Sequence, residues 1–464
     1  MNSNFNRLKA LVFCLILCVT TLSLSGCAKE GELIKTAKSG DFTYGVYSDH
    51  VEIVLYEGNG GKVDIPEKLG GKTVTVIGDF SFRNSEITTI TIPDTVKVIG
   101  EESFSNCESL KSLTLPKGIT EIKTGAFSYC SALNVVDMTA ATELLALSEN
   151  VFFKCVRLEE VILPSNLGSI ADGAFYECVK LSKLTFGNSL KTIGKMAFCG
   201  CEQIESLELP DSVETIGESA FEGCISLGGF TAGKGLRNIG SKAFAQCTNL
   251  SVLTLNEGIV SIKMGAFADS AITSVVVPNS VTDLEGAFSD CKKLDSVTLP
   301  STLKKIPDSI FAGCVSLKSI ILPTAITEIG NKAFFDCRLL TNLQIPQGVS
   351  RVGDYAFSQC IAIDKLSFSD NLKAIGEGAF SQCIGLNEIN LGNGLETIGK
   401  EAFASCLKMK YITLPATVTS VGDGVFKSCS YLRVVTILKE KDSLNASNWG
   451  VGFSITWKPQ EKQG

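Results

Sequence analysis

The sequence predicts a repeat solenoid in which parallel strands stack along one axis. Three observations support this fold class: a phrase of 22–25 residues recurs sixteen times, every copy contains a phenylalanine at the same place, and most copies contain a strand pattern that ends at proline. One copy is too short to bury its own apolar side, so neighbouring copies must stack. The copies begin at Ile77, Ile99, Ile122, Leu147, Ile170, Ile193, Ile216, Ile239, Ile262, Leu284, Ile306, Ile329, Val352, Ile375, Ile398 and Val421.

The unit from Ile99 to Glu121 shows how one copy is built. In Ser112–Leu115 apolar and polar residues alternate, which predicts a short strand, and Pro116 ends it because proline cannot donate to a strand ladder. Gly100 belongs to a glycine column that indicates a positive φ or a close backbone approach. We expect a short helical or 3-10 turn around the Ala-Phe pair and a second, smaller strand at Ile119–Ile122.

The phenylalanine column has no gap. Because a cofactor site would not recur in every unit, we interpret these rings as a spine through the core. The column is Phe82, Phe104, Phe127, Phe152, Phe175, Phe198, Phe221, Phe244, Phe267, Phe288, Phe311, Phe334, Phe357, Phe380, Phe403 and Phe426.

Fourteen of the eighteen cysteines stand three residues after that phenylalanine. In an exported protein many cysteines suggest disulfides, but side chains in one column of a parallel ladder point the same way, so we favour free, buried thiols. Cys199 is out of register and with Cys201 forms only a weak metal signal. The column is Cys107, Cys130, Cys155, Cys178, Cys201, Cys224, Cys247, Cys291, Cys314, Cys337, Cys360, Cys383, Cys406 and Cys429.

The repeated phrase Ile-Gly-x-x-Ala-Phe-x-x-Cys-x-x-Leu-x-x-Leu-x-Leu-Pro resembles the repeat of BspA-like leucine-rich-repeat proteins. The resemblance covers residues 77–438 and implies a leucine-rich-repeat solenoid displayed on a bacterial surface, with adhesion or protein recognition as its role. No functional residue carries over, because the family has no fixed functional motif.

The N-terminus predicts export and a lipid anchor. Residues 1–26 have a basic start and an apolar core too short for a comfortable membrane span, as in a signal peptide. Leu24-Ser-Gly-Cys27 resembles the lipobox of bacterial lipoproteins, which implies cleavage before Cys27 and lipid attached to it; the alternative is an ordinary signal peptide. We expect an extracytoplasmic protein held to a bacterial membrane, with residues 27–41 as its tether.

The ends of the solenoid need cover, since an open end exposes core and unpaired backbone. Residues 42–76 contain alternating strand patterns and predict an N-terminal β cap. Residues 439–464 contain both tryptophans and predict a C-terminal cap and tail.

Composition argues against several function classes. The net charge is −7, and residues 1–26 carry Arg7, Lys9 and no acid, so the remainder has −9; this disfavours nucleic acid as a partner. His50 is the one histidine, which argues against a zinc enzyme or a Ser-His triad. We therefore predict no enzyme activity, no metal and no cofactor, with a cell-wall or glycan-active enzyme as a distant third reading.

Three units depart from the consensus. The unit from Ile122 carries extra residues at 139–145, the unit from Ile262 lacks its cysteine, and the unit from Leu284 is one residue short before its phenylalanine. We favour tolerated drift in loops over a binding bulge.

The outward strand positions form a long polar surface, which we interpret as a protein- or glycan-binding face of a monomer, with a passive surface spacer as the alternative. Threonine recurs there, as on any half-exposed strand, and Tyr411 is the one residue of a hot-spot type. The candidate binding residues are Glu160, Lys183, Glu208, Gln344, Lys365, Glu388 and Tyr411.

Overall fold

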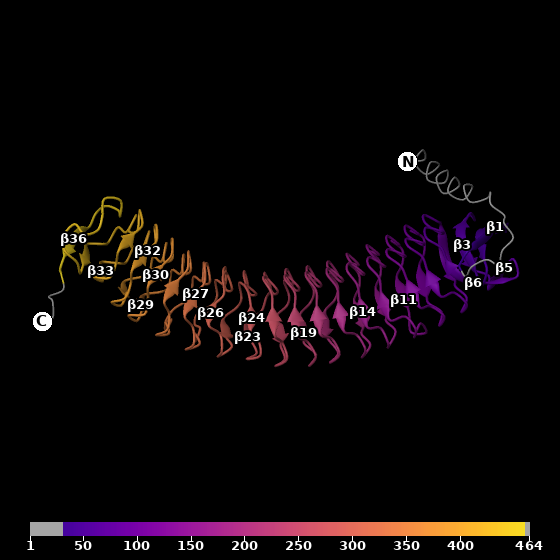
Figure 1. Ribbon diagram of the computed structural model, residues 1–464, viewed down its shortest axis with the longest axis horizontal. Coiled ribbons are helices and arrows are strands. Elements are labelled where there is room, and N and C mark those ends of the chain that lie inside the picture. The colour runs from indigo at the N-terminus through magenta and orange to yellow at the C-terminus, as the bar shows by residue number, and fades with distance from the viewer. Residues whose placement is uncertain (1–30, 460–464) are drawn as a thin grey trace.

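The computed structural model describes residues 31–459, which form a solenoid bent into an open arc (Figure 1). The signal peptide 1–26, the predicted lipidation site Cys27 and residues 460–464 lie outside the described residues. Within the described range no helix is long and apolar enough to cross a membrane.

Most turns of the solenoid contribute one strand to each of two columns, and the turns that contain residues 319–321 and 342–344 lack the long strand. The long column contains β7 (Ile87–Thr91), β9 (Ser112–Thr114), β11 (Val135–Asp137), β13 (Glu160–Ile162), β15 (Lys183–Thr185), β17 (Ser206–Glu208), β19 (Gly229–Thr231), β21 (Val252–Thr254), β23 (Ser274–Val276), β25 (Ser296–Thr298), β29 (Lys365–Ser367), β31 (Glu388–Asn390), β33 (Tyr411–Leu414) and β35 (Val434–Ile437). The short column contains β8 (Val98–Ile99), β10 (Glu121–Ile122), β12 (Ala146–Leu147), β14 (Ser169–Ile170), β16 (Thr192–Ile193), β18 (Thr215–Ile216), β20 (Asn238–Ile239), β22 (Ser261–Ile262), β24 (Asp283–Leu284), β26 (Lys305–Ile306), β27 (Glu328–Ile329), β28 (Arg351–Val352), β30 (Ala374–Ile375), β32 (Thr397–Ile398) and β34 (Ser420–Val421).

Pairing within both columns is parallel and keeps the repeat in register. In the long column Leu113, Val136 and Val161 are successive partners, and in the short column Ile216 pairs with Ile239 and Ile239 with Ile262. These residues face the core, whereas their strand neighbours face outward, as alternation requires. Gly100 stands at a close approach: a Cβ there would lie 2.6 Å from the backbone of the preceding turn, so only glycine fits without a shift.

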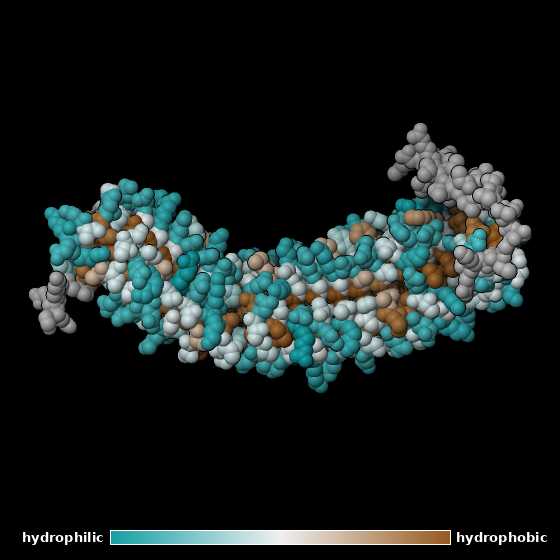
Figure 2. All heavy atoms as spheres, in the orientation of Figure 1, coloured by the Kyte–Doolittle hydropathy of each residue, from teal (hydrophilic) through white to brown (hydrophobic). Residues whose placement is uncertain are grey.

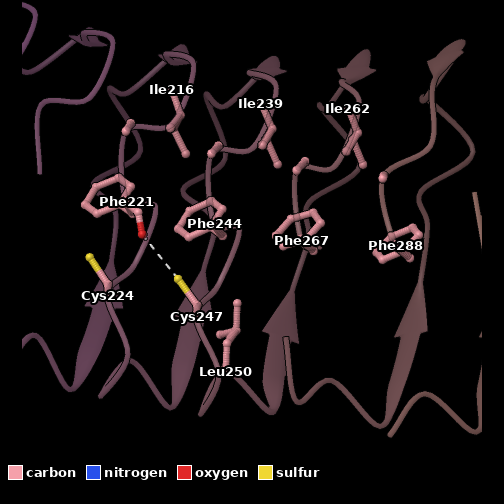
Figure 3. Packing of buried hydrophobic residues seen from close by; sticks show 14 of the residues in the cluster. Ile216, Phe221, Cys224, Ile239, Phe244, Cys247, Leu250, Ile262, Phe267 and Phe288 are labelled. Carbon is pink, nitrogen blue, oxygen red and sulfur yellow. Dashed lines mark hydrogen bonds between the residues drawn. The ribbon is translucent and has the colours of Figure 1, made fainter. Parts of the chain in front are cut away.

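The predicted phenylalanine spine is confirmed. Successive rings from Phe82 to Phe426 lie with their centroids 4.8–6.3 Å apart and stay within 28° of parallel. Figure 3 shows Phe221 and Phe244 between the isoleucines of the short column and the cysteines beside the long column, with Phe267 and Phe288 continuing the line of rings. The stack is continued by Tyr56 at the N-terminal end, and Trp449 meets Phe426 edge-on at the C-terminal end.

The expectation of helical or 3-10 turns was wrong for residues 31–459. Two residues four positions apart adopt a left-handed conformation in every repeat unit except the one from Leu284, as Glu102 (φ 45°) and Asn106 (φ 59°) do, so no helical run can form. The N–H groups of Glu102, Phe104 and Asn106 instead donate to carbonyls of the next turn at 2.8–3.0 Å. The residues between them close local four-residue β-turns, in which the N–H of Ser105 donates to the Glu102 carbonyl at 3.1 Å. The backbone thus pairs along the solenoid axis here as well.

The cysteine column consists of free thiols, as the direction of the side chains predicts. Each of the fourteen Sγ atoms donates a hydrogen bond to the carbonyl of the preceding turn's phenylalanine, at 3.0–3.4 Å. The Phe104 carbonyl, for example, accepts from Cys130 Sγ and from the Cys107 N–H, both at 3.2 Å. Cysteine suits this column because it is small and apolar yet carries a weak donor.

Both ends of the solenoid carry additional strands. The N-terminal end contains β1 (Leu33–Ser39), β2 (Phe42–Tyr47), β3 (Val51–Tyr56), β4 (Gly61–Asp64), β5 (Lys68–Leu69) and β6 (Lys72–Ile77), and the C-terminal end adds β36 (Ser454–Trp457). The predicted tether 27–41 needs a correction, because Leu33–Ser39 forms β1 and pairs antiparallel with β2. Gly40 (φ 56°) makes the tight turn between them, and Lys35 and Lys38 mark β1 as an exposed edge.

Candidate functional site

The outward side chains of the long column form one continuous surface, here called the strand face. All seven candidate binding residues lie on it. Six belong to strands β13, β15, β17, β29, β31 and β33, and Gln344 lies in the equivalent part of a turn where no strand pairing forms. The structure therefore places the candidates on one face but spreads them along its length.

Four of the candidates form two ion pairs at opposite ends of this face. Lys183 Nζ lies 3.6 Å from Glu160, and Lys365 Nζ lies 2.8 Å from Glu388. The hydrogen bond from Lys365 to Glu388 raises the pKa of the Lys365 ammonium. Exposed pairs of this kind add little stability. Eight turns separate Lys183 from Lys365, about 38 Å at the strand spacing of a sheet, so these pairs are no single site.

Two hollows lie where the pairing of the long column is interrupted. One, of about 240 Å³, lies between β31 and β33 and is lined by Glu388, Asn390 and Tyr411. The other, of about 400 Å³, lies between β15 and β17 and is lined by Phe186 and Glu208 among others. Glu388 and Tyr411 are the two candidates that line one hollow together.

Between Glu208 and Lys365 the outward positions of the strand face carry no charge. Six consecutive turns, from Glu208 to Lys365, present only uncharged side chains at their outward positions; we call this surface the neutral strip. Three of its aliphatic side chains are largely exposed: Val252 (60%), Val276 (65%) and Ile321 (88%). The neutral strip is Gly229, Thr231, Val252, Thr254, Ser274, Val276, Ser296, Thr298, Ser319, Ile321, Asn342 and Gln344.

Sequence reasoning missed the aliphatic members of the neutral strip. Val252, Val276 and Ile321 occupy the same outward positions as the polar candidates, so the repeat register was a sufficient signal. These three residues were missed because only the polar members of the two outward columns were considered as binding residues. Figure 2 shows one face of the arc, with hydrophobic residues in a line along its long axis between hydrophilic margins.

A second exposed cluster lies on the turn side of the solenoid. The rings of Phe153 and Tyr176 stack with centroids 4.9 Å apart, and Tyr129 meets Phe153 edge-on at 5.4 Å. Lys154 lies over the Phe153 ring and pairs with Glu177 at 3.3 Å. The hydrogen bond to Glu177 raises the pKa of the Tyr176 hydroxyl. The rings of Phe153 and Tyr176 cover each other's faces, so they offer little free ring surface to a ligand.

The described residues contain no group of three or more His, Cys, Asp or Glu side chains placed to hold a metal ion. His50 lies in the N-terminal cap, where its ring stacks on Tyr47 at 4.6 Å and its Nδ1 lies 2.8 Å from Asp49. Cys199 is half-buried, and burial together with Glu222 and Glu177 raises the pKa of its thiol to about 11, so it is a protonated, weakly nucleophilic thiol at neutral pH.

Comparison with known proteins agrees with the geometry. The model of the BspA type leucine rich repeat region (6 copies) matches residues 75–198, 168–287, 284–373 and 350–448. No curated protein sequence matches the chain.

Among solved structures, a leucine-rich repeat protein from Bacteroides ovatus has 24% identity, with 90% of this chain and 98% of that chain covered and a TM-score of 0.61. A leucine rich cell surface protein from Faecalibacterium prausnitzii has 20% identity, coverage of 93% and 97%, and a TM-score of 0.35. The pneumococcal vaccine antigen PcpA has 21% identity, coverage of 93% and 89%, and a TM-score of 0.32. The similarity to the Bacteroides structure is one of fold.

Proposed function

The chain belongs to the BspA-type leucine-rich-repeat family, and on that premise we propose that it is a non-catalytic recognition protein of the bacterial surface. In this proposal the protein is a monomer that mediates adhesion. Its neutral strip is the surface that binds another protein. The outward face of a repeat solenoid suits this role because it offers an extended, rigid surface.

The neutral strip is the observation that carries the proposal. The core of a protein interface is depleted of charge and contains well-exposed apolar groups before binding, with a charged rim around it. The strip has this arrangement: Val252, Val276 and Ile321 lie in its interior, and Glu208 and Lys365 border its two ends. A glycan is the weaker candidate, since the strip contains no aromatic ring on which a sugar could stack.

The site of action follows from the N-terminal sequence. We propose that the signal peptide 1–26 directs export and that Cys27 carries a lipid that holds the protein to the membrane. Mass spectrometry of the mature protein tests this step. A lipid-modified Cys27 at the N-terminus supports the anchor, and an unmodified thiol contradicts it.

Binding is tested by a pull-down with the mature protein against host matrix proteins and surface proteins of the same cell. Val252→Glu with Ile321→Glu places two charges in the strip and should weaken capture at least tenfold. Leu145→Glu is the matched control, because Leu145 is equally exposed (62%) but lies outside the strip. If the native protein retains nothing at any salt concentration, the passive spacer is the better interpretation.

A further inference from the structure

Up to three lines of backbone hydrogen bonds join neighbouring turns of the solenoid. Between the units that begin at Ile239 and Ile262, for example, β20 pairs with β22 in the short column. The N–H of Lys263 continues that line to the Ile239 carbonyl at 3.0 Å. On the turn side, three N–H groups of residues 242–246 donate to carbonyls of residues 264–268 at 2.7–3.0 Å. The long column supplies a third line only where its strands pair, as β19 and β21 do at the preceding junction; β21 and β23 do not pair.

Between the units that begin at Leu284 and Ile306 the short column is interrupted. One seven-stranded sheet ends at β24 and the next sheet begins at β26, with no pairing between them. Proline at 307 contributes to this gap, because it has no N–H group. In the following turn the N–H of Gly330, at the equivalent position, donates to the Ile306 carbonyl at 2.8 Å. The Leu284 carbonyl has no such donor from the turn that contains Pro307.

The long column is interrupted at the same place. The sheet that contains β25 consists of β23 and β25 alone, and residues 319–321 of the next turn form no strand pair with it. On the turn side two of the three usual bonds remain, Phe288 N–H to Ile310 at 3.2 Å and Asp290 N–H to Ala312 at 2.6 Å. In residues 31–459 this is the one junction between units where both columns are unpaired.

The packing is loosest at this junction as well. The rings of Phe288 and Phe311 lie 6.3 Å apart, the widest step in the spine. A hollow of about 550 Å³ opens between the turns and is lined by both unpaired strands and Pro307. Two side-chain links remain: Cys314 Sγ donates to the Phe288 carbonyl at 3.1 Å, and Lys318 Nζ lies 2.7 Å from Asp295.

We propose that the solenoid contains a hinge at this junction, with the turns up to β25 forming one arm and the turns from β26 onward forming the other. Backbone pairing makes each arm stiff, whereas the junction bends by opening the hollow beside Pro307. The hinge also divides the neutral strip, with Val276 on one arm and Ile321 on the other. Bending then fits the strip to the curvature of a partner, a role that rests on the proposed function.

The hinge is tested by distances between spin labels on the mature protein without any partner. Both label pairs use long-column positions six turns apart, about 29 Å at the strand spacing of a sheet. The pair Val252→Cys and Glu388→Cys spans the junction, and the pair Ser112→Cys and Val252→Cys lies within one arm. The side chains of all three labelled positions face outward, and Cys199→Ser removes the half-buried native thiol. Variants with one introduced cysteine serve as controls, because they show a distance only if a native thiol also carries a label.

A distance distribution at least twice as wide across the junction as within the arm supports the hinge. Equal widths for the two pairs overturn it. Because no partner is present, this result is independent of whether the neutral strip binds a protein.

Discussion

The insertion in the unit from Ile122 and the deletion in the unit from Leu284 both interrupt the short column, but only the deletion coincides with a break in the long column. At the insertion, β10 and β12 are unpaired, yet β9, β11 and β13 pair without interruption. The turn side also keeps its three bonds there, from residues 125–129 to residues 149–153. At the deletion, neither column continues.

The difference follows from where the change in length falls. The added residues lie between a long and a short strand, and they fold into a turn of their own that buries Ala141 and Leu144. The missing residue lies between the short strand and the phenylalanine. Leu284 and Phe288 still keep register with the preceding turn, and pairing is lost only toward the following turn. A loop can take up added residues at little cost in free energy. A deletion between the short strand and the phenylalanine leaves no loop that could take up the change in length.

The largest expected effect comes from alkaline pH. It tests whether the thiols of the cysteine column stay buried and protonated on both sides of Ser270, where the column is interrupted. Burial raises the pKa of the Cys247 and Cys383 thiols from 9.0 to about 12. The unfolded chain therefore loses protons that the folded chain keeps, and stability falls as pH rises from about 9 to about 12, by ~1.4 kcal/mol per pH unit for each thiol.

Circular dichroism from pH 8 to 12 should show cooperative loss of structure, and Cys383→Val should make the pH dependence less steep. Unchanged ellipticity up to pH 12 would contradict a ladder of buried, protonated thiols.

Removing one ring of the spine is the next largest change. Phe152→Ala, beside the insertion, and Phe311→Ala, beside the deletion, should each cost about 3–5 kcal/mol. Phe311→Ala should be the milder, because its ring is already 6.3 Å from Phe288. Urea unfolding should be followed by circular dichroism and by fluorescence of Trp449 and Trp457, which report on the C-terminal arm.

In Phe311→Ala the fluorescence transition should come before the main loss of ellipticity. In Phe152→Ala it should come after. If the fluorescence and ellipticity transitions coincide in both variants, the two arms unfold together and the deletion does not separate them.

The packing of the insertion is tested at two adjacent alanines. Ala141 is fully buried and Ala140 is exposed. Ala141→Asn buries an amide without a partner and should lower the free energy of unfolding by about 1–3 kcal/mol. Ala140→Asn should leave it unchanged. Equal urea midpoints for the two variants would show that the insertion is an unpacked loop.

The smallest effect concerns the gap in the ladder just before the deletion. Ser270 stands where the cysteine belongs, and its Oγ lies 3.3 Å from Cys291 Sγ instead of reaching the Phe244 carbonyl. Ser270→Cys restores the missing donor and should raise the free energy of unfolding by about 0.5 kcal/mol. Ser270→Ala should lower it. A destabilised cysteine variant would show that the shortened loop no longer accommodates the consensus residue.

The repeat predicted the fold because one phrase recurs in register. The register of the repeat was therefore enough to predict that Phe104 and Cys130 lie in the core. The helical turns were wrong because left-handed residues such as Glu102 and Asn106 have no compositional mark in this chain. The outward face was predicted, but Val252 and Ile321 show that an exposed site need not be polar. Pro307 and the short unit were visible in the sequence, whereas the accompanying break in the long column has no mark in residues 319–321 and became visible only in the structure.

The free thiols of the ladder have a consequence for how this protein is made. An exported chain that relied on disulfides would need an oxidant and a correct choice among many pairings. Here each Sγ finds its acceptor on the previous turn as soon as that turn is in place. The solenoid of residues 31–459 therefore needs no oxidant to reach its folded state, and a reductant has no disulfide to cleave within that range.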